Sequence, residues 1–244
     1  MTEEEWLECT KPLSMLRYLE GKMTARKQRL FLGSCCHRIY RLLISDHSKE
    51  LIEVSDRFAD DQANTEDLQI ACDRAEGYLT LGTTDDPHRQ QAVCQAGLAV
   101  LGLGIDLDLL YMDVVVNAVV AESGVNPFMA INHPIPKEES DRMLEEFFAQ
   151  CEPAASPERS AQAHLIRDIF NPFHTVTLDP CWLNFTVTAL AQRMYDTRDF
   201  SAMPILADAL QDANCDNPQI LEHCRGPHVH VRGCWVIDGC LNKT

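Results

Sequence analysis

Four dipeptides that pair a helix-capping residue with proline constrain the fold of this chain more than any other feature of its sequence. They are Asp86-Pro87, Ser156-Pro157, Asp179-Pro180 and Asn217-Pro218. The side-chain oxygen of the capping residue accepts a hydrogen bond from a free backbone N–H of the first helical turn. Proline in that turn loses no hydrogen bond, because its position has no intrahelical partner. Each dipeptide therefore predicts the start of a helix.

Apolar residues recur at helical spacing through most of the 244 residues and predict where the helices run. The predicted helices cover 24–44, 46–60, 64–81, 86–103, 106–121, 136–150, 157–170, 180–196, 203–212, 218–225 and 233–241. Strand signals are few, and only 175–178 reads as a short extended segment. We therefore expect an all-α fold, a compact multi-helix bundle of roughly ten helices with little or no β structure.

The domain organisation follows from length and from the positions of glycine and proline. A chain of 244 residues suits one large domain or two small ones. Gly124, Pro127, Pro134 and Pro136 predict a loop break near 122–136. We expect a single helical domain over 1–244, with a variable middle segment at 81–157.

The charge balance indicates the class of partner. With 37 acidic and 21 basic residues the net charge is -16, which repels nucleic acid and anionic lipid at long range. We therefore expect a protein partner, and neither a nucleic acid nor a membrane. Residues 11–41 hold eight basic residues and one acidic residue, a net charge of +7. This stretch predicts a basic helical surface that is solvated or packed against the acidic body, or else a docking face for an acidic partner or a phosphate group. The residues assigned to such a face are Arg26, Lys27, Arg29, Arg38 and Arg41.

Targeting signals and cysteine usage point to the reducing cytoplasm. No apolar run reaches the roughly 18 residues of a membrane span, and the acidic segment 1–8 lacks the pattern of a signal peptide. The 11 cysteines form no CxxC pair, so we expect free thiols that act mostly as small core residues.

One loop gathers the residues best suited to chemistry. Five metal-ligand types fall within 223–234: His223, Cys224, His228, His230 and Cys234. Thiolate and imidazole ligands suit zinc, but the spacing matches no common zinc pattern. The segment reads either as a plain connection between two helices, as a metal site, or as another ligand site.

Two thiols are candidates for reactivity. Cys36 lies in the Cys35-Cys36-His37 cluster, and Cys234 follows Gly233 at a predicted helix start, where the helix dipole would lower a thiol pKa. Three arginines beside loops, Arg167, Arg225 and Arg232, are predicted to hold carboxylates or backbone carbonyls in place.

Several stretches at the two ends of the chain resemble a family of uncharacterised proteins abundant in planctomycete-type bacteria. The similar stretches are 5–10 (EWLECT), 26–31 with 35–39 (RKQRLF and CCHRI), 167–173, 178–183, 204–210 (PILADAL), and 223–225 with 234–238. The chain differs from that family at Asn214, where glycine is usual. The resemblance implies no established activity, and it implies that the two ends form one domain around a variable insert.

Taken from the residues, the first hypothesis for function is a non-enzymatic protein-interaction or regulatory module without a cofactor. The second is a metal-binding protein or enzyme that holds zinc or iron with the loop 223–234. The third is a thiol-dependent enzyme that uses Cys36 or Cys234.

Overall fold

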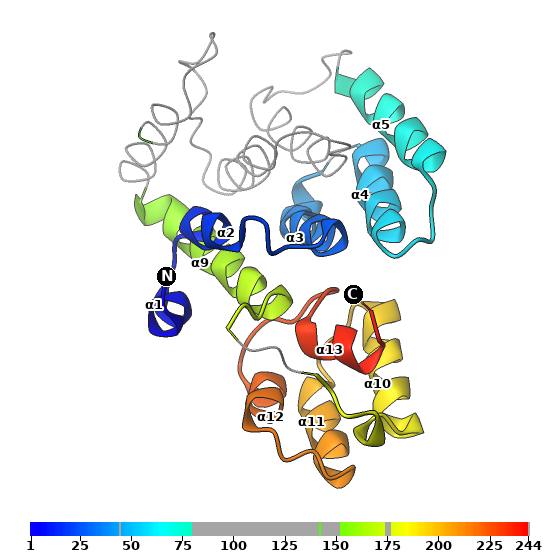
Figure 1. Cartoon of the computed structure of the whole chain (residues 1–244). Coiled ribbons are helices and arrows are strands. Elements are labelled where there is room, and N and C mark those ends of the chain that lie inside the picture. The colour runs from blue at the N-terminus through cyan, green and yellow to red at the C-terminus, as the bar shows by residue number, and fades with distance from the viewer. Residues whose placement is uncertain (44, 80–141, 143–151, 174–176, 244) are drawn as a thin grey trace. The chain divides into compact units, whose positions relative to one another are not determined.

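The computed structural model describes residues 1–43, 45–79, 142, 152–173 and 177–243. Within these ranges the regular structure consists of ten α-helices and two 3-10 helices, without a strand (Figure 1). The prediction of an all-α fold is confirmed. The predicted helices at 86–103 and 106–121, most of 136–150, and the loop break at 122–136 lie outside the described residues. No described helix combines the length and the apolar character that a membrane crossing needs.

The chain divides into two compact units. The terminal unit comprises Met1–Ser34 and Ala163–Thr244, and the middle unit comprises Cys35–Gln162. The boundaries fall inside two helices, α3 (Ala25–Arg38) and α9 (Glu152–Ile169). The prediction of one domain over 1–244 stays a prediction, as does the variable segment at 81–157.

The terminal unit is built from short helices around one apolar core. It contains the part of α3 before residue 35 and the part of α9 after residue 162. Its other elements are α1 (Glu3–Glu8), α2 (Pro12–Leu19), η3 (Pro180–Trp182), α10 (Phe185–Thr197), α11 (Met203–Asp212), α12 (Pro218–Arg225) and α13 (Trp235–Cys240). Helix α10 packs on α11 and α13, and α12 packs on α11 and α13 (Figure 1). Their shared core includes the fully buried Val187, Leu206, Ile220 and Ile237. This core fixes α12 and α13, the two helices that flank the loop 226–234.

The capping signal at Asn217 was right, the one at Asp179 marks only a 3-10 turn, and the one at Ser156 was wrong. Helix α12 begins at Pro218, and the side chain of Asn217 accepts hydrogen bonds from the backbone of residues 219 and 220. The side chain of Asp179 caps only the 3-10 turn η3, so the predicted start of an α-helix at 180 is wrong. The α-helix begins at Phe185, because Asn184 offers a second cap that accepts from the Val187 N–H.

The predicted start at Ser156-Pro157 is also wrong. Helix α9 begins at Glu152, so Pro157 lies inside it, beyond the first turn in which proline loses no hydrogen bond. The predicted bounds 203–212 and 218–225 are confirmed. Sequence periodicity missed α1 and α2, although Thr2 and Glu5 form a reciprocal capping box at the start of α1.

The middle unit contains a packed helix pair. Helices α4 (Asp46–Ala59) and α5 (Thr65–Leu79) lie side by side (Figure 1) around the buried side chains of Leu51, Val54 and Leu68. The predicted helix 24–44 is shorter than expected, because α3 ends at Arg38 and the 3-10 turn η1 (Tyr40–Leu42) follows. In the same unit Arg38 forms a bidentate ion pair with the buried Glu158.

Candidate metal centre

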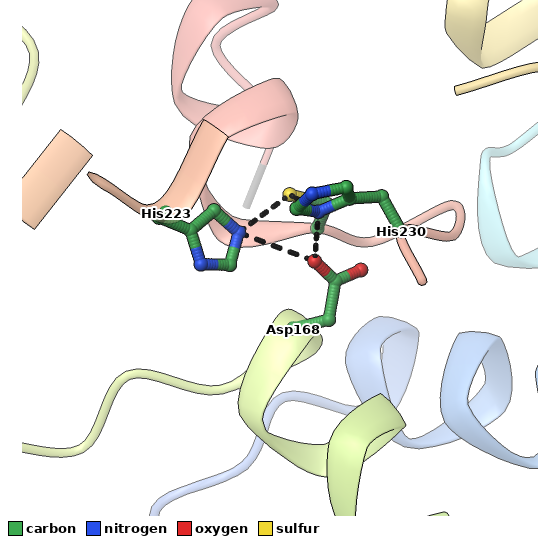
Figure 2. Close-up of side chains that lie close together, drawn as sticks. Asp168, His223 and His230 are labelled. Atoms are coloured by element: carbon green, nitrogen blue, oxygen red, sulfur yellow. Dashed lines mark hydrogen bonds and ion pairs between the residues drawn. The ribbon is translucent and has the colours of Figure 1, made fainter. Parts of the chain in front are cut away.

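Four side chains that suit a metal ion come together in the terminal unit, from four segments of the chain. Asp168 lies in the last turn of α9, and His223 lies in the last turn of α12. His230 belongs to the loop after α12, and Cys234 is the N-cap of α13. One ligand atom from each of these residues lies within 4.8 Å of all the others (Figure 2). Three of the four residues are buried, and the side chain of His223 is 14% exposed.

Short contacts link all four residues of this group. Oδ1 of Asp168 lies 2.6 Å from Nδ1 of His230 and 3.2 Å from Nε2 of His223. Sγ of Cys234 lies 3.2 Å from the same Nε2 and 3.9 Å from the same Nδ1. The rings of His223 and His230 meet edge to face, with their centroids 4.9 Å apart. Oxygen, sulfur and two nitrogens thus surround one common point.

Each imidazole uses a single nitrogen for both of its contacts in the group. Nε2 of His223 faces Asp168 and Cys234 together, and Nδ1 of His230 does the same (Figure 2). A nucleophile relay has another geometry, because there the base contacts the nucleophile with one nitrogen and its orienting carboxylate with the other. Convergence of one atom per residue is the arrangement of ligands around a metal ion.

The distances are close to those of a tetrahedral zinc site. With Zn–N and Zn–O bonds of about 2.0–2.1 Å and a Zn–S bond of about 2.3 Å, neighbouring ligands lie about 3.3 Å apart, or about 3.6 Å where one is sulfur. Three of the four contacts agree with these values to within about 0.4 Å. The contact between Asp168 and His230 is shorter, at 2.6 Å, as befits a direct hydrogen bond.

The loop that delivers His230 and Cys234 depends on a glycine. Gly233 has a φ of +90°, a conformation that L side chains rarely adopt. A Cβ at this position would also lie 3.1 Å from Cδ1 of Leu30. The glycine therefore lets the backbone turn closely over α3 and set Cys234 at the start of α13.

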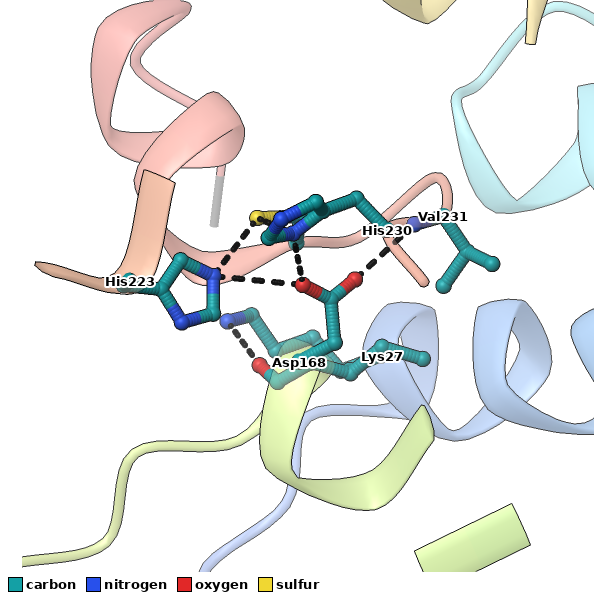
Figure 3. A network of polar contacts seen from close by, with 7 residues as sticks. Lys27, Asp168, His223, His230 and Val231 are labelled. Atoms are coloured by element: carbon teal, nitrogen blue, oxygen red, sulfur yellow. Dashed lines mark hydrogen bonds and ion pairs between the residues drawn. The ribbon is translucent and has the colours of Figure 1, made fainter. Parts of the chain in front are cut away.

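The carboxylate of Asp168 is oriented by a backbone hydrogen bond. Its Oδ2 atom accepts the N–H of Val231 at 2.9 Å, which leaves Oδ1 directed toward the two histidines (Figure 3). Burial acts to raise the pKa of Asp168, but hydrogen bonds from His223 and His230 outweigh it and hold the pKa below its ordinary value. The group therefore carries an ionised carboxylate, a good ligand for a divalent cation.

Lys27 closes one side of this network. Its Nζ donates a hydrogen bond of 2.9 Å to the carbonyl of Ile169 at the end of α9 (Figure 3). Burial lowers the pKa of Lys27, while the nearby acidic groups, Asp238 first, raise it in opposition. Lys27 also lies close enough to Cys234 and Asp168 for their charges to affect it.

Three of the five predicted metal ligands belong to the group, and two do not. His223, His230 and Cys234 are brought together. Cys224 is fully buried in the apolar core beside α13, and His228 is exposed and stacks on His164. Substitution of Cys224 is therefore a control for substitution of Cys234, and substitution of His228 is a control for substitution of His230.

Sequence reasoning missed Asp168 as a ligand, because it lies 55 residues before His223. The neighbouring Arg167 was predicted to hold carboxylates or carbonyls, and it donates to the backbone carbonyls of Trp6 and Cys9. Arg232 likewise donates to the carbonyl of Tyr195 at 2.8 Å. These contacts confirm the structural role expected of both arginines.

The two candidate reactive thiols are deeply buried. Burial raises the pKa of Cys36, and the charge of Asp56 acts in the same direction. Burial and the charge of Asp168 also raise the pKa of Cys234, although backbone N–H groups of α13 oppose this. The expected lowering of the Cys234 pKa at a helix start is therefore wrong, because α13 has only six residues and burial dominates.

The residues assigned to a basic docking face take different positions. Arg26 pairs with the buried Asp238 at 2.7 Å, and Lys27 donates to the Ile169 carbonyl, so both stabilise the interior of the terminal unit. Arg29 is partly buried, Arg38 pairs with Glu158, and Arg41 is exposed. A docking face that uses Arg29, Arg38 and Arg41 stays a prediction.

A cavity of about 330 Å³ borders the group of ligands. Asp168 and His223 form part of its lining, together with Arg167 and the aromatic rings of Trp6, Phe173 and Trp235. Trp235 also packs against His223, with the ring centroids 4.7 Å apart. The group is therefore reachable from one side through this cavity.

No family model, no curated protein and no solved structure matches this chain. The resemblance to a planctomycete-type family accordingly stays a prediction.

Proposed function

We propose that this protein binds a zinc ion in the terminal unit, with Asp168, His223, His230 and Cys234 as the four ligands. The observation that carries the proposal is the convergence of one ligand atom from each residue within 4.8 Å, inside a buried site. A buried carboxylate, thiol and two imidazoles need partners, and a divalent cation is a partner for all four together.

The donor set favours zinc. One sulfur, two nitrogens and one oxygen form a mixed set that suits the borderline-soft Zn²⁺ ion in a tetrahedral geometry. Iron prefers more ligands or open positions in such mixed sites, so it is the alternative to test. The thiol of Cys234 loses its proton on binding, since a coordinating thiol is deprotonated by the metal.

The proposed role of the metal is to hold the terminal unit together. Asp168, His223, His230 and Cys234 belong to α9, α12, the following loop and α13, so one ion joins four segments. Helix α12 has eight residues and α13 has six, and such short helices depend on tertiary contacts. Zinc binding supplies such a contact, since a site formed only in the folded chain adds its binding free energy to folding.

The geometry supports a metal ligand more than a nucleophile at Cys234. A thiol-dependent enzyme needs an accessible thiol with a lowered pKa, whereas Cys234 is fully buried and its pKa is raised. The interaction module remains a prediction, and it is compatible with a metal that only stabilises the fold.

The test is the zinc stoichiometry and thermal stability of the whole chain, compared between two buried cysteines. Cys234→Ala removes a proposed ligand, and Cys224→Ala removes an equally buried thiol that lies outside the group. We expect one zinc per chain and a rise of several degrees in Tm on adding zinc to the wild type and to Cys224→Ala. Cys234→Ala should show neither.

Two outcomes would overturn the proposal. One is a wild-type protein that binds no zinc after purification without chelator and subsequent zinc addition. The other is equal zinc binding by the two cysteine variants, which would place the metal elsewhere. Elemental analysis of the metal that copurifies with the protein decides between zinc and iron, because Zn²⁺ outcompetes Fe²⁺ at most such sites in a direct titration.

A further inference from the structure

Arg167 lines the cavity beside the proposed zinc site. Nε of Arg167 donates to the Trp6 carbonyl at 3.1 Å, and Nη2 donates to the Cys9 carbonyl. Among the residues that the structure describes, Nη1 has no hydrogen-bond partner. Arg167 lines the cavity and directly precedes the ligand Asp168 in α9. The guanidinium is thus held in the wall of the cavity that Asp168 and His223 also line.

Part of the cavity lining is aromatic and comes from Trp6, Phe170, Phe173 and Trp235. Trp6 and Phe173 meet at a centroid distance of 6.0 Å and an angle of 66°, and Phe173 stacks on Tyr18 at 5.4 Å. Because Arg167 fixes the backbone of residues 6 and 9, the Trp6 wall and the guanidinium keep their relative positions. A volume of about 330 Å³ lies at the small end of ligand pockets. These features favour a small molecule with a flat apolar body and one polar group.

The charge of the site depends on the metal. Without a cation, the carboxylate of Asp168 in the cavity lining disfavours a bound anion. A divalent ion compensates the carboxylate of Asp168 and the thiolate of Cys234. Arg167 then contributes the remaining charge of the inner wall, while the exposed Glu3 and Glu222 lie on the lining farther toward solvent. Metal loading therefore turns a site that repels anions into one that accepts them.

The geometry points to this cavity as a binding site for small aromatic or apolar carboxylic acids. The carboxylate is bound by Arg167 on the side of the metal, and the body of the molecule lies against Trp6 and Phe173. This inference rests on the proposed zinc site, because the anion is accepted only when the metal is bound.

Calorimetric titration of the full-length protein with benzoate tests this assignment. We expect benzoate to bind zinc-loaded protein, and benzyl alcohol and benzylamine, which keep the ring and lack the carboxylate, to bind at least about tenfold more weakly. The protein stripped of zinc should bind benzoate about tenfold or more weakly as well. In the cobalt-substituted protein, benzoate should change the visible absorption bands of the metal, since a fifth ligand or a near anion alters its coordination.

An arginine pair provides the matched variants. Arg167→Gln should weaken benzoate binding about tenfold or more, whereas Arg225→Gln, at an arginine that pairs with the exposed Asp208, should leave it unchanged. If Arg167→Gln does not fold, the comparison of benzoate with benzyl alcohol on the wild type still tests whether the cavity recognises the carboxylate. A protein that binds no metal contradicts the zinc site itself. A protein that binds zinc but takes up benzoate no better than benzyl alcohol, or takes up benzylamine best, overturns only the carboxylate site.

Discussion

Oδ1 of Asp168 lies 2.6 Å from Nδ1 of His230, closer than two ligands of one zinc ion lie to each other. This contact is a hydrogen bond that holds a buried carboxylate beside a buried imidazole. A tetrahedral zinc ion would separate the two atoms to about 3.3 Å. Zinc binding at the proposed site would therefore lengthen this contact.

The acid stability of the metal-free protein should depend on Asp168. Its pKa in the folded protein lies below the ordinary value, because hydrogen bonds from His223 and His230 outweigh the opposing effect of burial. The carboxylate therefore stabilises the fold above the unfolded pKa of about 3.9, and this stabilisation is lost as the pH falls through the folded pKa. Urea unfolding at a series of pH values measures the free energy of unfolding. This free energy should fall less steeply with decreasing pH in Asp168→Asn than in the wild type. The same pH dependence in Asp168→Asn and the wild type would contradict the inferred hydrogen bonding.

The two histidines of the loop should differ sharply in their effect on zinc affinity. His230→Ala removes a ligand, and we expect a loss of more than about 100-fold, beyond the 10- to 100-fold effect of residues that only support ligands. His228 is exposed and lies two residues before His230, outside the ligand group. His228→Ala should therefore change the zinc affinity little. Competition with a chromogenic chelator measures both values. Equal losses would indicate that the loop acts only through its conformation.

Thiol labelling should separate exposed from buried cysteines. Cys181 is exposed, but the hydrogen bond and charge of Asp179 raise its pKa, so iodoacetamide should react with it more slowly at neutral pH than with a free thiol. Asp179→Asn keeps a good cap for η3 and removes the charge, so labelling should become faster. Cys36 and Cys234 should react only after unfolding. Fast labelling of either in the native protein, detected by mass spectrometry, would revive the thiol-enzyme hypothesis.

The ion pair of the middle unit should contribute measurably to stability. Glu158 is 5% exposed and also accepts a hydrogen bond from Gln162. Arg38→Ala would leave this carboxylate buried without its cation, at a cost of about 2–3 kcal/mol, because Arg38 is itself one-third exposed. Adding Glu158→Gln should recover part of the loss in a double-mutant cycle. Arg41→Ala, at an exposed position, should change stability by less than about 0.5 kcal/mol.

The all-α class could be predicted from the sequence because apolar periodicity and capping are local properties. Asn217-Pro218 begins α12 as predicted, since the Asn217 side chain accepts hydrogen bonds from the N–H groups of Gln219 and Ile220. Asp179-Pro180 failed because Asn184 provides a second cap five residues later. Local signals therefore located most of the described helices, α1 and α2 excepted, but could not choose between neighbouring starts.

The ligand group could be predicted only in part. His223, His230 and Cys234 are close in sequence, so their shared loop was visible as a cluster. Asp168 comes from α9, and only the packing of that helix against the loop brings it near. The same packing excludes Cys224, which has the residue type of a ligand but points into the core.

X-ray absorption spectroscopy at the zinc edge of the loaded protein tests the central claim most directly. The proposed site predicts one sulfur at about 2.3 Å and three nitrogen or oxygen ligands at about 2.0–2.1 Å. Loss of the sulfur contribution in Cys234→Ser, with zinc still present, would assign that ligand. A wild-type spectrum without sulfur, or with a shell of six oxygens, would contradict the site formed by Asp168, His223, His230 and Cys234.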